Sequence, residues 1–533
     1  MKTLELGSET LAFVGCYLMV MIGLGLLGRA RSREASLADF YLGGSSFGVV
    51  VLFLTFFATQ YSGNTLLGFA GRAYQRGASY IVSVTFMILA ITILVAYAPR
   101  LYRLSRRFGY ITPADFVFHR FRSHGLRVLT VLLLSWGLAN YILEQLVAMG
   151  RGVEAMAGGK LTAVIVALCR KVGLSSMVAE VAPGELDFMG GVLILVLVML
   201  VYESLGGMRA VAWTDVIQGG LLFAGCGCIL YILLGTEGGL AAATETISRA
   251  TPEKLRLPDA AGLRSWVSTL VLLSFGVAFY PHAIQRVFAA RDQAVLRRSL
   301  GLMAFMPLVT TLLAFLLGYI GSARFPGLGQ SESDKITVLV LTGMGDSLFI
   351  KWLVIVVLTA VLAAIMSTAD SALLSVASMF TKDIYKAYLR PDATPAQCLR
   401  VGKRFGWFLM CLLVLSAYAS LKTQSSIWLL IKLKLEFMVQ ISPAFLLGLF
   451  WRGLRPRAAL AGMIAGTAVT LVIWAGSILG AWTTRSPLGF SAGVWGLTLN
   501  YAFCVIGSAS ARLTQTETDA PHLPPAADGP AAG

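Results

Sequence analysis

Residues 347–375 read SLFIKWLVIVVLTAVLAAIMSTADSALLS, an apolar run with one lysine near its start. The run is long enough to cross a lipid bilayer, which takes about 20 residues. Its second half nevertheless contains Ser367, Thr368, Asp370 and Ser371. A polar group at membrane depth costs free energy unless something pairs with it, so this stretch predicts a functional site inside a membrane.

The composition of the whole chain predicts an all-α polytopic membrane protein. Of its 533 residues, 57% are hydrophobic and 13% are charged, whereas soluble proteins carry about 25% charged residues. We expect about thirteen transmembrane helices. The expected spans are 8–28, 47–74, 77–102, 125–152, 187–205, 211–235, 263–284, 298–322, 348–385, 399–421, 426–450, 457–480 and 488–510.

The positive charges predict an orientation. The formal net charge is +16, but the basic residues cluster in short segments between apolar runs, such as RLYRLSRRFG at 100–109 and WRGLRPR at 451–457. This pattern orients a chain in a membrane and does not predict nucleic-acid binding. With alternating spans, the positive-inside rule places the amino terminus outside and the carboxyl terminus in the cytoplasm, in a multi-pass protein of the inner (plasma) membrane.

Two spans contain residues that interrupt helices. The second span includes FFATQYSGNTLLGFAG at 56–71, and the seventh includes SFGVAFYPH at 274–282. Irregular backbone at membrane depth is tolerated only where it lines a cavity or is buried in protein. Broken helices at matching places in two inverted repeats indicate the substrate and ion sites of a transporter. The alternative is two ordinary kinks in tightly packed helices.

One face of the ninth span carries hydroxyl groups. Ala364, Ser367, Thr368 and Ser371 have the spacing i, i+3, i+4, i+7 and therefore share a helix face. Uncharged hard oxygens suit a monovalent hard cation, because divalent ions usually draw several carboxylates and transition metals prefer His or Cys. The alternative is that these hydroxyls bond to carbonyls of their own helix.

The eleventh span contains KLKLEF, a charged segment in an apolar helix. Lys432, Glu436 and Gln440 are spaced i, i+4, i+8 and form one polar stripe, while Lys434 points elsewhere. Charged groups in lipid are expensive even when paired, so we expect this stripe to line a cavity, where Lys432 or Lys434 could meet a substrate carboxylate. The alternative is an intrahelical Lys–Glu pair that neutralises itself.

Three further segments carry polar residues at membrane depth. Asn140, Glu144 and Gln145 predict an inward polar face on the fourth span. Asp215 lies at the start of the sixth span, where a carboxylate can be functional or can simply compensate the helix dipole. His282 follows a proline and has no carboxylate near it in the sequence, so we expect it to be structural.

Four segments together resemble the sodium:solute symporter family. They are ADFYLGG at 38–44, GGMRAVAWTDVIQ at 206–218, PHAIQRVFAARD at 281–292 and AAIMSTADSALLSVASMFTKDIYK at 363–386. The resemblance covers about residues 38–450 and implies a LeuT-like 5+5 inverted-repeat core that works by alternating access. The implied division is a first helix and loop at 1–46, a first repeat at 47–235, an extracytoplasmic loop at 236–262, a second repeat at 263–450, two further helices at 451–512 and a disordered cytoplasmic tail at 513–533.

The resemblance also implies a sodium site between the second and ninth spans. Its ligands would be the backbone carbonyls of Ala58 and Tyr61 in the broken helix, the Ala364 carbonyl, and the hydroxyls of Ser367 and Thr368.

A second cation or coupling site is implied at Asp215, together with Ser367, Asp370 and Ser371. This chain has Asp370 where some family members carry a hydroxyl. A second sodium ion and a proton shared between Asp215 and Asp370 therefore both stay open.

Substrate contacts in the family come from the broken helices and from spans that match the fourth and eleventh. The implied substrate-binding residues are Gln60, Asn64, Thr65, Asn140, Phe279 and Glu436. Gln60 stands where proline transporters carry an aspartate, and KLKLEF matches nothing in the proline or glucose members.

The resulting expectation is sodium-coupled uptake of a small polar organic solute, most simply an amino acid or a carboxylate. Na⁺ is the expected coupling ion, and the expected partners are a small-molecule substrate and the lipid bilayer, with no obligatory protein partner. No nucleophile–base pair or metal-ligand cluster in the spans suggests an enzyme. The alternatives are a symporter-like membrane sensor, a sugar or proton-coupled transporter, and a channel.

Overall fold

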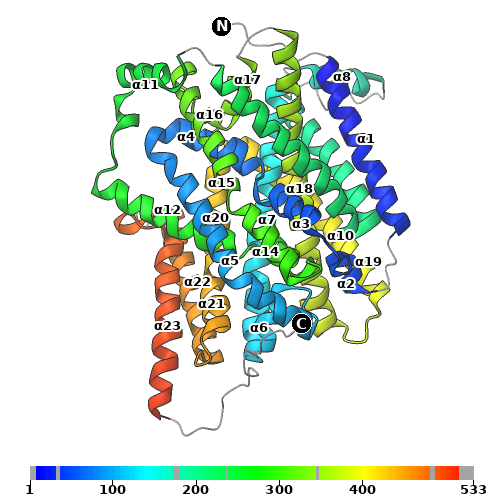
Figure 1. Cartoon of the computed structure of the whole chain (residues 1–533), viewed down its shortest axis with the longest axis vertical. Coiled ribbons are helices and arrows are strands. Elements are labelled where there is room, and N and C mark those ends of the chain that lie inside the picture. Colours follow the sequence, from blue (N-terminus) through cyan, green and yellow to red (C-terminus); the bar gives the residue numbers. More distant parts are fainter. Residues whose placement is uncertain are drawn as a thin grey trace.

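The computed structural model describes residues 8–31, 36–157, 159–171, 181–235, 238–343, 347–480 and 486–514. These residues are almost entirely helical, and within them the only β-type contact is an isolated bridge between Phe47 and Ala290. Figure 1 shows long helices bundled side by side, with α18 (Leu348–Met379) in the interior and α1 (Ser8–Arg31) on the outside.

The predicted spans are confirmed as helices. Eleven described stretches are long and apolar enough to cross a membrane, and two shorter apolar helices join them. Besides α1 and α18, the span helices are α3 (Val49–Gln60) with α4 (Ala70–Arg76), α5 (Val82–Phe108), α7 (His124–Ala157), α10 (Pro183–Leu234), α12 (Ala260–Ala278) with α13 (Pro281–Ala289), α14 (Gln293–Met303), α15 (Met306–Val309) and α16 (Thr311–Arg324), α19 (Pro395–Lys422), α20 (Ile427–Met438) with α21 (Ser442–Phe450), α22 (Pro456–Ile478) and α23 (Ala492–Thr514).

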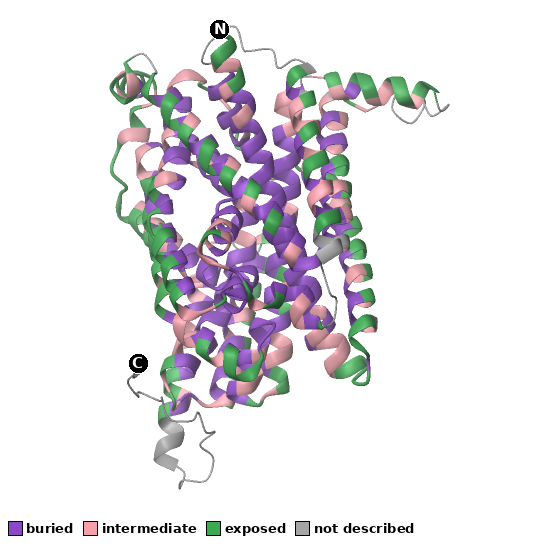
Figure 2. Ribbon diagram, turned by 45° about the vertical axis from the view of Figure 1, so that its right-hand side comes forward, coloured by how far each residue is buried: buried purple, intermediate pink, exposed green. Residues whose placement is uncertain are grey.

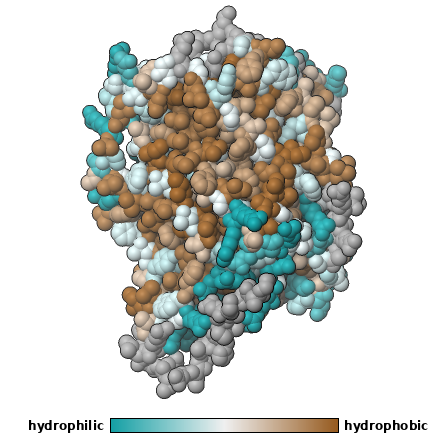
Figure 3. Space-filling view, viewed as in Figure 1, coloured by the Kyte–Doolittle hydropathy of each residue, from teal (hydrophilic) through white to brown (hydrophobic). Residues whose placement is uncertain are grey.

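Burial follows the pattern of a bundle in lipid. Figure 2 shows buried residues running through the middle of the bundle and exposed ones along its outside. The visible face in Figure 3 is covered by hydrophobic side chains over most of its height, and hydrophilic ones gather toward one end. Large apolar side chains on the outside are half exposed or more, for example Leu132, Phe223 and Phe408. Such exposure is expected for a surface that faces lipid.

Both predicted helix interruptions are present. α3 ends at Gln60, Tyr61 is extended (φ −109°, ψ 97°), and the chain resumes as a π-helix at Asn64–Phe69 that leads into α4. α12 ends at Ala278, and Pro281 opens α13. The second break falls at Phe279 and Tyr280, because proline fits the first turn of a new helix but not a helix interior.

The fifth and sixth spans join without a loop. The sequence predicts separate spans at 187–205 and 211–235, whereas the structure runs them together in α10 with a sharp bend at Gly207 (φ 55°, ψ −149°). A Cβ added at Gly207 would lie 2.7 Å from ring carbons of Phe40, which belongs to the short helix α2 (Leu37–Leu42). Only glycine adopts this positive φ without strain and leaves room for the Phe40 ring.

Two segments that lie between expected spans contain helices. Segment 153–186 includes α8 (Lys160–Lys171), and 236–262 includes α11 (Gly239–Ala250). α11 buries Ala243 and Ile247, four residues apart on one face, so it forms because that face packs against the bundle. The tail predicted to be disordered, 513–533, lies outside the described residues beyond Thr514, where α23 ends.

Gly207→Ala should destabilise the protein. The φ and ψ at this bend lie in a region that costs other residues roughly 1–3 kcal/mol, and the new methyl group would press on Phe40. We expect a lower midpoint in thermal unfolding followed by tryptophan fluorescence of the purified protein. The matched control is Gly227→Ala in the same helix, where a Cβ meets nothing within 4 Å. Equal midpoints for the two variants would contradict this account of the bend.

Candidate functional site

The hydroxyl face of α18 lies at the centre of the bundle. Ser367, Thr368 and Asp370 are fully buried, and Ser371 is almost so. α18 packs against α10, α7 and α3, which bring their own polar groups to this face. The face predicted from the spacing in the sequence is therefore an interior surface between helices.

Part of the predicted sodium site is assembled. The Thr368 hydroxyl lies 3.5 Å from the Ala58 carbonyl oxygen and 3.4 Å from that of Thr59, in the last turn of α3 before the break. Tyr61 and Ala364 are buried on the same two segments. Ser367 instead donates a hydrogen bond to Asp215 Oδ1 over 2.5 Å. A hydroxyl that donates its proton still has oxygen lone pairs for a cation.

An arginine occupies the predicted second cation site. One nitrogen of Arg286, on α13, lies 2.7 Å from Asp215 Oδ2 and donates to Ser371 Oγ over the same distance. Both partners of this ion pair are buried, with exposures of 1% and 0%. The sequence analysis missed Arg286, although it lies in the quoted motif PHAIQRVFAARD. The available signal was a charged residue five positions after the proline of a broken membrane helix.

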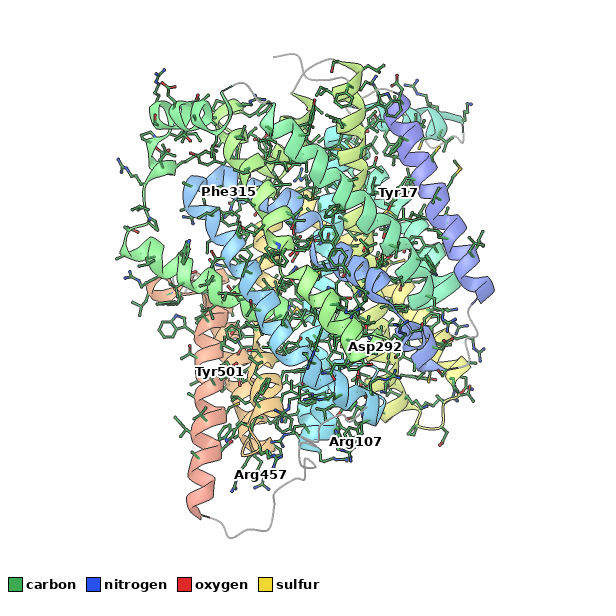
Figure 4. The ribbon with its side chains drawn as sticks, viewed as in Figure 1. Tyr17, Arg107, Asp292, Phe315, Arg457 and Tyr501 are labelled. Atoms are coloured by element: carbon green, nitrogen blue, oxygen red, sulfur yellow. The ribbon has the colours of Figure 1, made fainter. Side chains whose placement is uncertain are left out.

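Asp370 has partners of its own. Tyr202 donates to Asp370 Oδ2 over 2.5 Å, and Ser371 donates to its other oxygen over 3.3 Å. Asp370 and Asp215 are thus linked through Ser371 and Arg286, each carboxylate held by different groups. One helix turn beyond Asp215 on α10, Gln218 donates to the hydroxyl of Tyr17, a side chain of α1 labelled in Figure 4.

A second buried ion pair lies beside the break in the second span. Lys434 of α20 is 2.7 Å from Glu144 Oε2 of α7, with exposures of 1% and 0%. Asn64 donates to the same oxygen over 2.5 Å. Gln145 accepts from the backbone N–H of Gly63 over 3.2 Å and donates to Asn64 over 3.3 Å. The inward polar face predicted on the fourth span is confirmed, since Asn140 is buried as well.

The predicted orientation of the eleventh span is wrong. Lys434 faces the centre, while Lys432 is 25% exposed and lies 4.0 Å from Glu436. Glu436, expected to contact substrate, accepts a hydrogen bond from the indole of Trp474 on α22. Gln440 donates to the Gly493 carbonyl of α23 over 2.9 Å. The three residues do share a face, but that face packs on the last two helices.

The remaining predicted substrate residues surround the two breaks. Gln60 and Thr65 are buried at the break in the second span, and Phe279 at the break in the seventh stacks on Tyr97 with ring centroids 5.1 Å apart. Several buried side-chain atoms here have no hydrogen-bond partner among the described residues. They are both amide atoms of Gln60, Oδ1 of Asn140, Oε1 of Glu144 and both ring nitrogens of His282.

The far end of α18 is tied down by ion pairs. α18 continues as a π-helix at Phe380–Leu389. In this segment Asp383 lies 2.7 Å from Arg127 of α7, and Lys382 lies 2.5 Å from Asp115. Asp115 belongs to α6 (Pro113–Phe121). These pairs connect the π-helix to two neighbouring helices at one end of the bundle.

The donor set at the centre fits a hard monovalent cation. Neutral hydroxyl and carbonyl oxygens meet at Thr368 and the end of α3, and the nearby carboxylate of Asp215 is neutralised by Arg286. In the part of the chain that the structure describes, no three His, Cys, Asp or Glu side chains are grouped to hold a metal ion. This oxygen chemistry suits sodium rather than a divalent or transition metal.

Known proteins resemble this chain over nearly its whole length. The osmoregulated proline transporter OpuE of Bacillus subtilis is 28% identical over 480 residues, covering 87% of this chain and 88% of the relative. The sodium/pantothenate symporter of Escherichia coli is 26% identical over 470 residues, covering 86% and 89%. A solved Na⁺-coupled sialic acid symporter in a substrate-bound, outward-open state has the same fold, with a TM-score of 0.70, 19% identity and coverage of 94% and 97%.

The fold and the sequence point to the same family. The architecture is the LeuT-like inverted-repeat fold of about thirteen helices that the sequence analysis predicts. The sequence model of one family, described as "Sodium:solute symporter family", matches residues 40–178 and 183–466. The chain therefore belongs to the sodium:solute symporter family.

Proposed function

We propose that this protein is a sodium-coupled symporter that carries a small polar organic solute, an amino acid or a carboxylate, into the cell. The observation that carries the proposal is the placement of Thr368 opposite the carbonyl oxygens that end α3, beside a buried cluster of charged and amide groups. Relatives named as proline and pantothenate symporters support it. A membrane potential of 100 mV would add about 2.3 kcal/mol per charge moved.

The proposed sodium site consists of the carbonyl oxygens of Ala58, Tyr61 and Ala364 and the hydroxyls of Ser367 and Thr368. The hydrogen bond from Ser367 to Asp215 supports this assignment, because it fixes the hydroxyl and leaves its lone pairs for the cation. An ion there would bridge α3 and α18 at the break. It would stabilise the conformation in which the neighbouring polar groups form a solute site.

Asp215, Asp370 and Ser371 form the proposed coupling site. In this conformation a guanidinium already neutralises Asp215 and donates to Ser371. A second sodium ion would have to displace Arg286, so we propose that one sodium ion, bound at the first site, accompanies each solute. Arg286 acts as a built-in cation that links α13 to α10 and α18.

Transport would proceed by alternating access of two inverted repeats, 47–235 and 263–450. Sodium and solute must favour each other's binding equally, because coupling between two sites is reciprocal. The ion pairs Arg127–Asp383 and Lys382–Asp115 join the π-helix after α18 to α7 and α6 at one end of the bundle, and we propose that they loosen when that side opens. Each chain contains a whole set of these groups, and we propose a transporter, not an enzyme, that needs no protein partner.

Replacing both hydroxyls of the sodium site should abolish sodium binding. An ion that binds the folded state raises the midpoint of thermal unfolding, so the unaltered protein should unfold at a higher temperature in NaCl than in KCl of equal ionic strength. We expect the double variant Ser367→Ala, Thr368→Ala to lose this difference. Thr359→Ala is the matched control, since this buried hydroxyl of α18 donates to the Ile355 carbonyl of its own helix. A double variant that keeps the full sodium-dependent shift would contradict the assignment.

Arg286→Met should destabilise the protein far more than Arg286→Met combined with Asp215→Asn. Removing one partner of a buried ion pair costs roughly 3–5 kcal/mol, because the other charge is left uncompensated. Thermal unfolding of the single and double variants measures the recovery. Arg291→Met is the control, because Arg291 is 66% exposed and pairs with its neighbour Asp292. Additive losses in the double variant would contradict the pairing.

The amino terminus is proposed to lie outside the cell and the carboxyl terminus in the cytoplasm. Arg107 and Arg457, labelled in Figure 4, lie toward the same end of the bundle, as expected of a basic cytoplasmic side. A reporter that fluoresces only in the cytoplasm, fused to the carboxyl terminus, should be bright. A second fusion carries a reporter that is active only in the periplasm at the same terminus. Signal from this second fusion alone would contradict the proposed orientation.

A further inference from the structure

The ion pair between Lys434 and Glu144 is not needed for the sodium site. It joins α20 to α7 over 2.7 Å and is buried on both sides. Taking two charges out of water is costly, and well-packed apolar residues in their place are often at least as stable. A buried pair deep in a membrane protein is therefore better explained by function than by stability.

The pair has unused hydrogen-bonding capacity around it. Glu144 accepts from Lys434 and Asn64 at one oxygen, and its other oxygen is buried without a partner among the described residues. Gln60, the last residue of α3 before the break in the second span, also has neither amide atom paired within the described chain. Since buried polar groups are normally satisfied, these donors and acceptors can serve a polar solute that brings groups of both kinds.

Aromatic faces adjoin the Lys434 ammonium. The Lys434 ammonium lies 3.4 Å from the ring centroid of Tyr141 and 5.3 Å from that of Tyr280. The two rings stack with their centroids 5.0 Å apart, and Tyr280 belongs to the break in the seventh span. Tyr141 also donates to Ser62 at the break in the second span, over 3.3 Å. The ion pair thus lies between both broken helices, and its aromatic walls stabilise the Lys434 ammonium.

We propose that Lys434 and Glu144 recognise the two charges of a zwitterionic solute, an amino acid or a close analogue. This inference rests on the proposed function and names the solute class. The solute carboxylate pairs with the Lys434 ammonium, and the solute's cationic group pairs with Glu144. Without solute the two side chains neutralise each other, which is the arrangement in this structure.

Charge balance separates a zwitterion from the other solute classes. A zwitterion replaces one ion pair by two and adds no net charge to a buried site. A simple carboxylate would leave Glu144 without a counter-charge, and a simple amine would leave Lys434 without one. A neutral sugar would have to part the pair and offer no charge to either side. Uncompensated buried charge is strongly unfavourable.

The test is a thermal-shift screen of the purified full-length protein in NaCl. The panel contains the twenty common amino acids, glycine betaine and neutral sugars. Each zwitterion is compared with two analogues, an amine that lacks its carboxylate and an acid that lacks its cationic group. We expect stabilisation by one or more zwitterions, at least tenfold weaker binding of the matched amine and acid, and loss of the shift in KCl.

An acid, an amine or a sugar that binds as tightly as the best zwitterion would overturn the inference while leaving sodium-coupled transport intact. Sodium stabilisation without any effect of any zwitterion in the panel would overturn it too. No shift with sodium itself would instead contradict the proposed function. The screen uses the unaltered protein, so it decides the question even where variants fold poorly.

Substitutions test which residues bind the solute. Lys434→Met and Glu144→Gln should each weaken binding of the stabilising zwitterion at least tenfold while leaving the shift by sodium alone in place. Lys432→Met, two residues away on the partly exposed side of α20, is the matched control and should bind as the unaltered protein does. Equal affinities in Lys434→Met and Lys432→Met would overturn the assignment.

Discussion

The site depends on how the broken second span satisfies its backbone. Hydrocarbon offers no hydrogen-bond partners, so a break in a membrane helix persists only where neighbouring groups replace the lost helical bonds. Gln145 accepts from the Gly63 N–H on one side of the break, and the Thr368 hydroxyl meets the carbonyls of Ala58 and Thr59 on the other. The same contacts that make the break tolerable fix α7 and α18 around it. The carbonyl oxygens that end α3 are buried against α18 as a result.

Four of the charged groups at the centre form two ion pairs. Asp215 with Arg286, and Glu144 with Lys434, each bring one positive and one negative group from different helices. Within each pair the two charges neutralise each other, and Asp370 is held by the hydroxyls of Tyr202 and Ser371 instead. The pairs also join helices of both proposed repeats, so a shift in either pair is felt across the bundle.

Much of this structure could be predicted from local sequence. A membrane span needs about 20 apolar residues, which located the helices, and the residues around Gly63 and Pro281 located the breaks. Helix rotation could not be predicted, because a period of 3.6 shows which residues share a face but not what the face packs against. Lys434, not Glu436, faces the centre for that reason. Arg286 was missed because its partner Asp215 lies 71 residues away on another helix.

The loop-free bend at Gly207 has a mechanical consequence. Its two spans are joined by a single residue whose conformation is fixed by the Phe40 ring packed against it, so their ends cannot separate by more than a small fraction of a helix turn. A movement of the end of the fifth span must therefore displace the start of the sixth span with it. Asp215 lies in that segment, eight residues beyond Gly207.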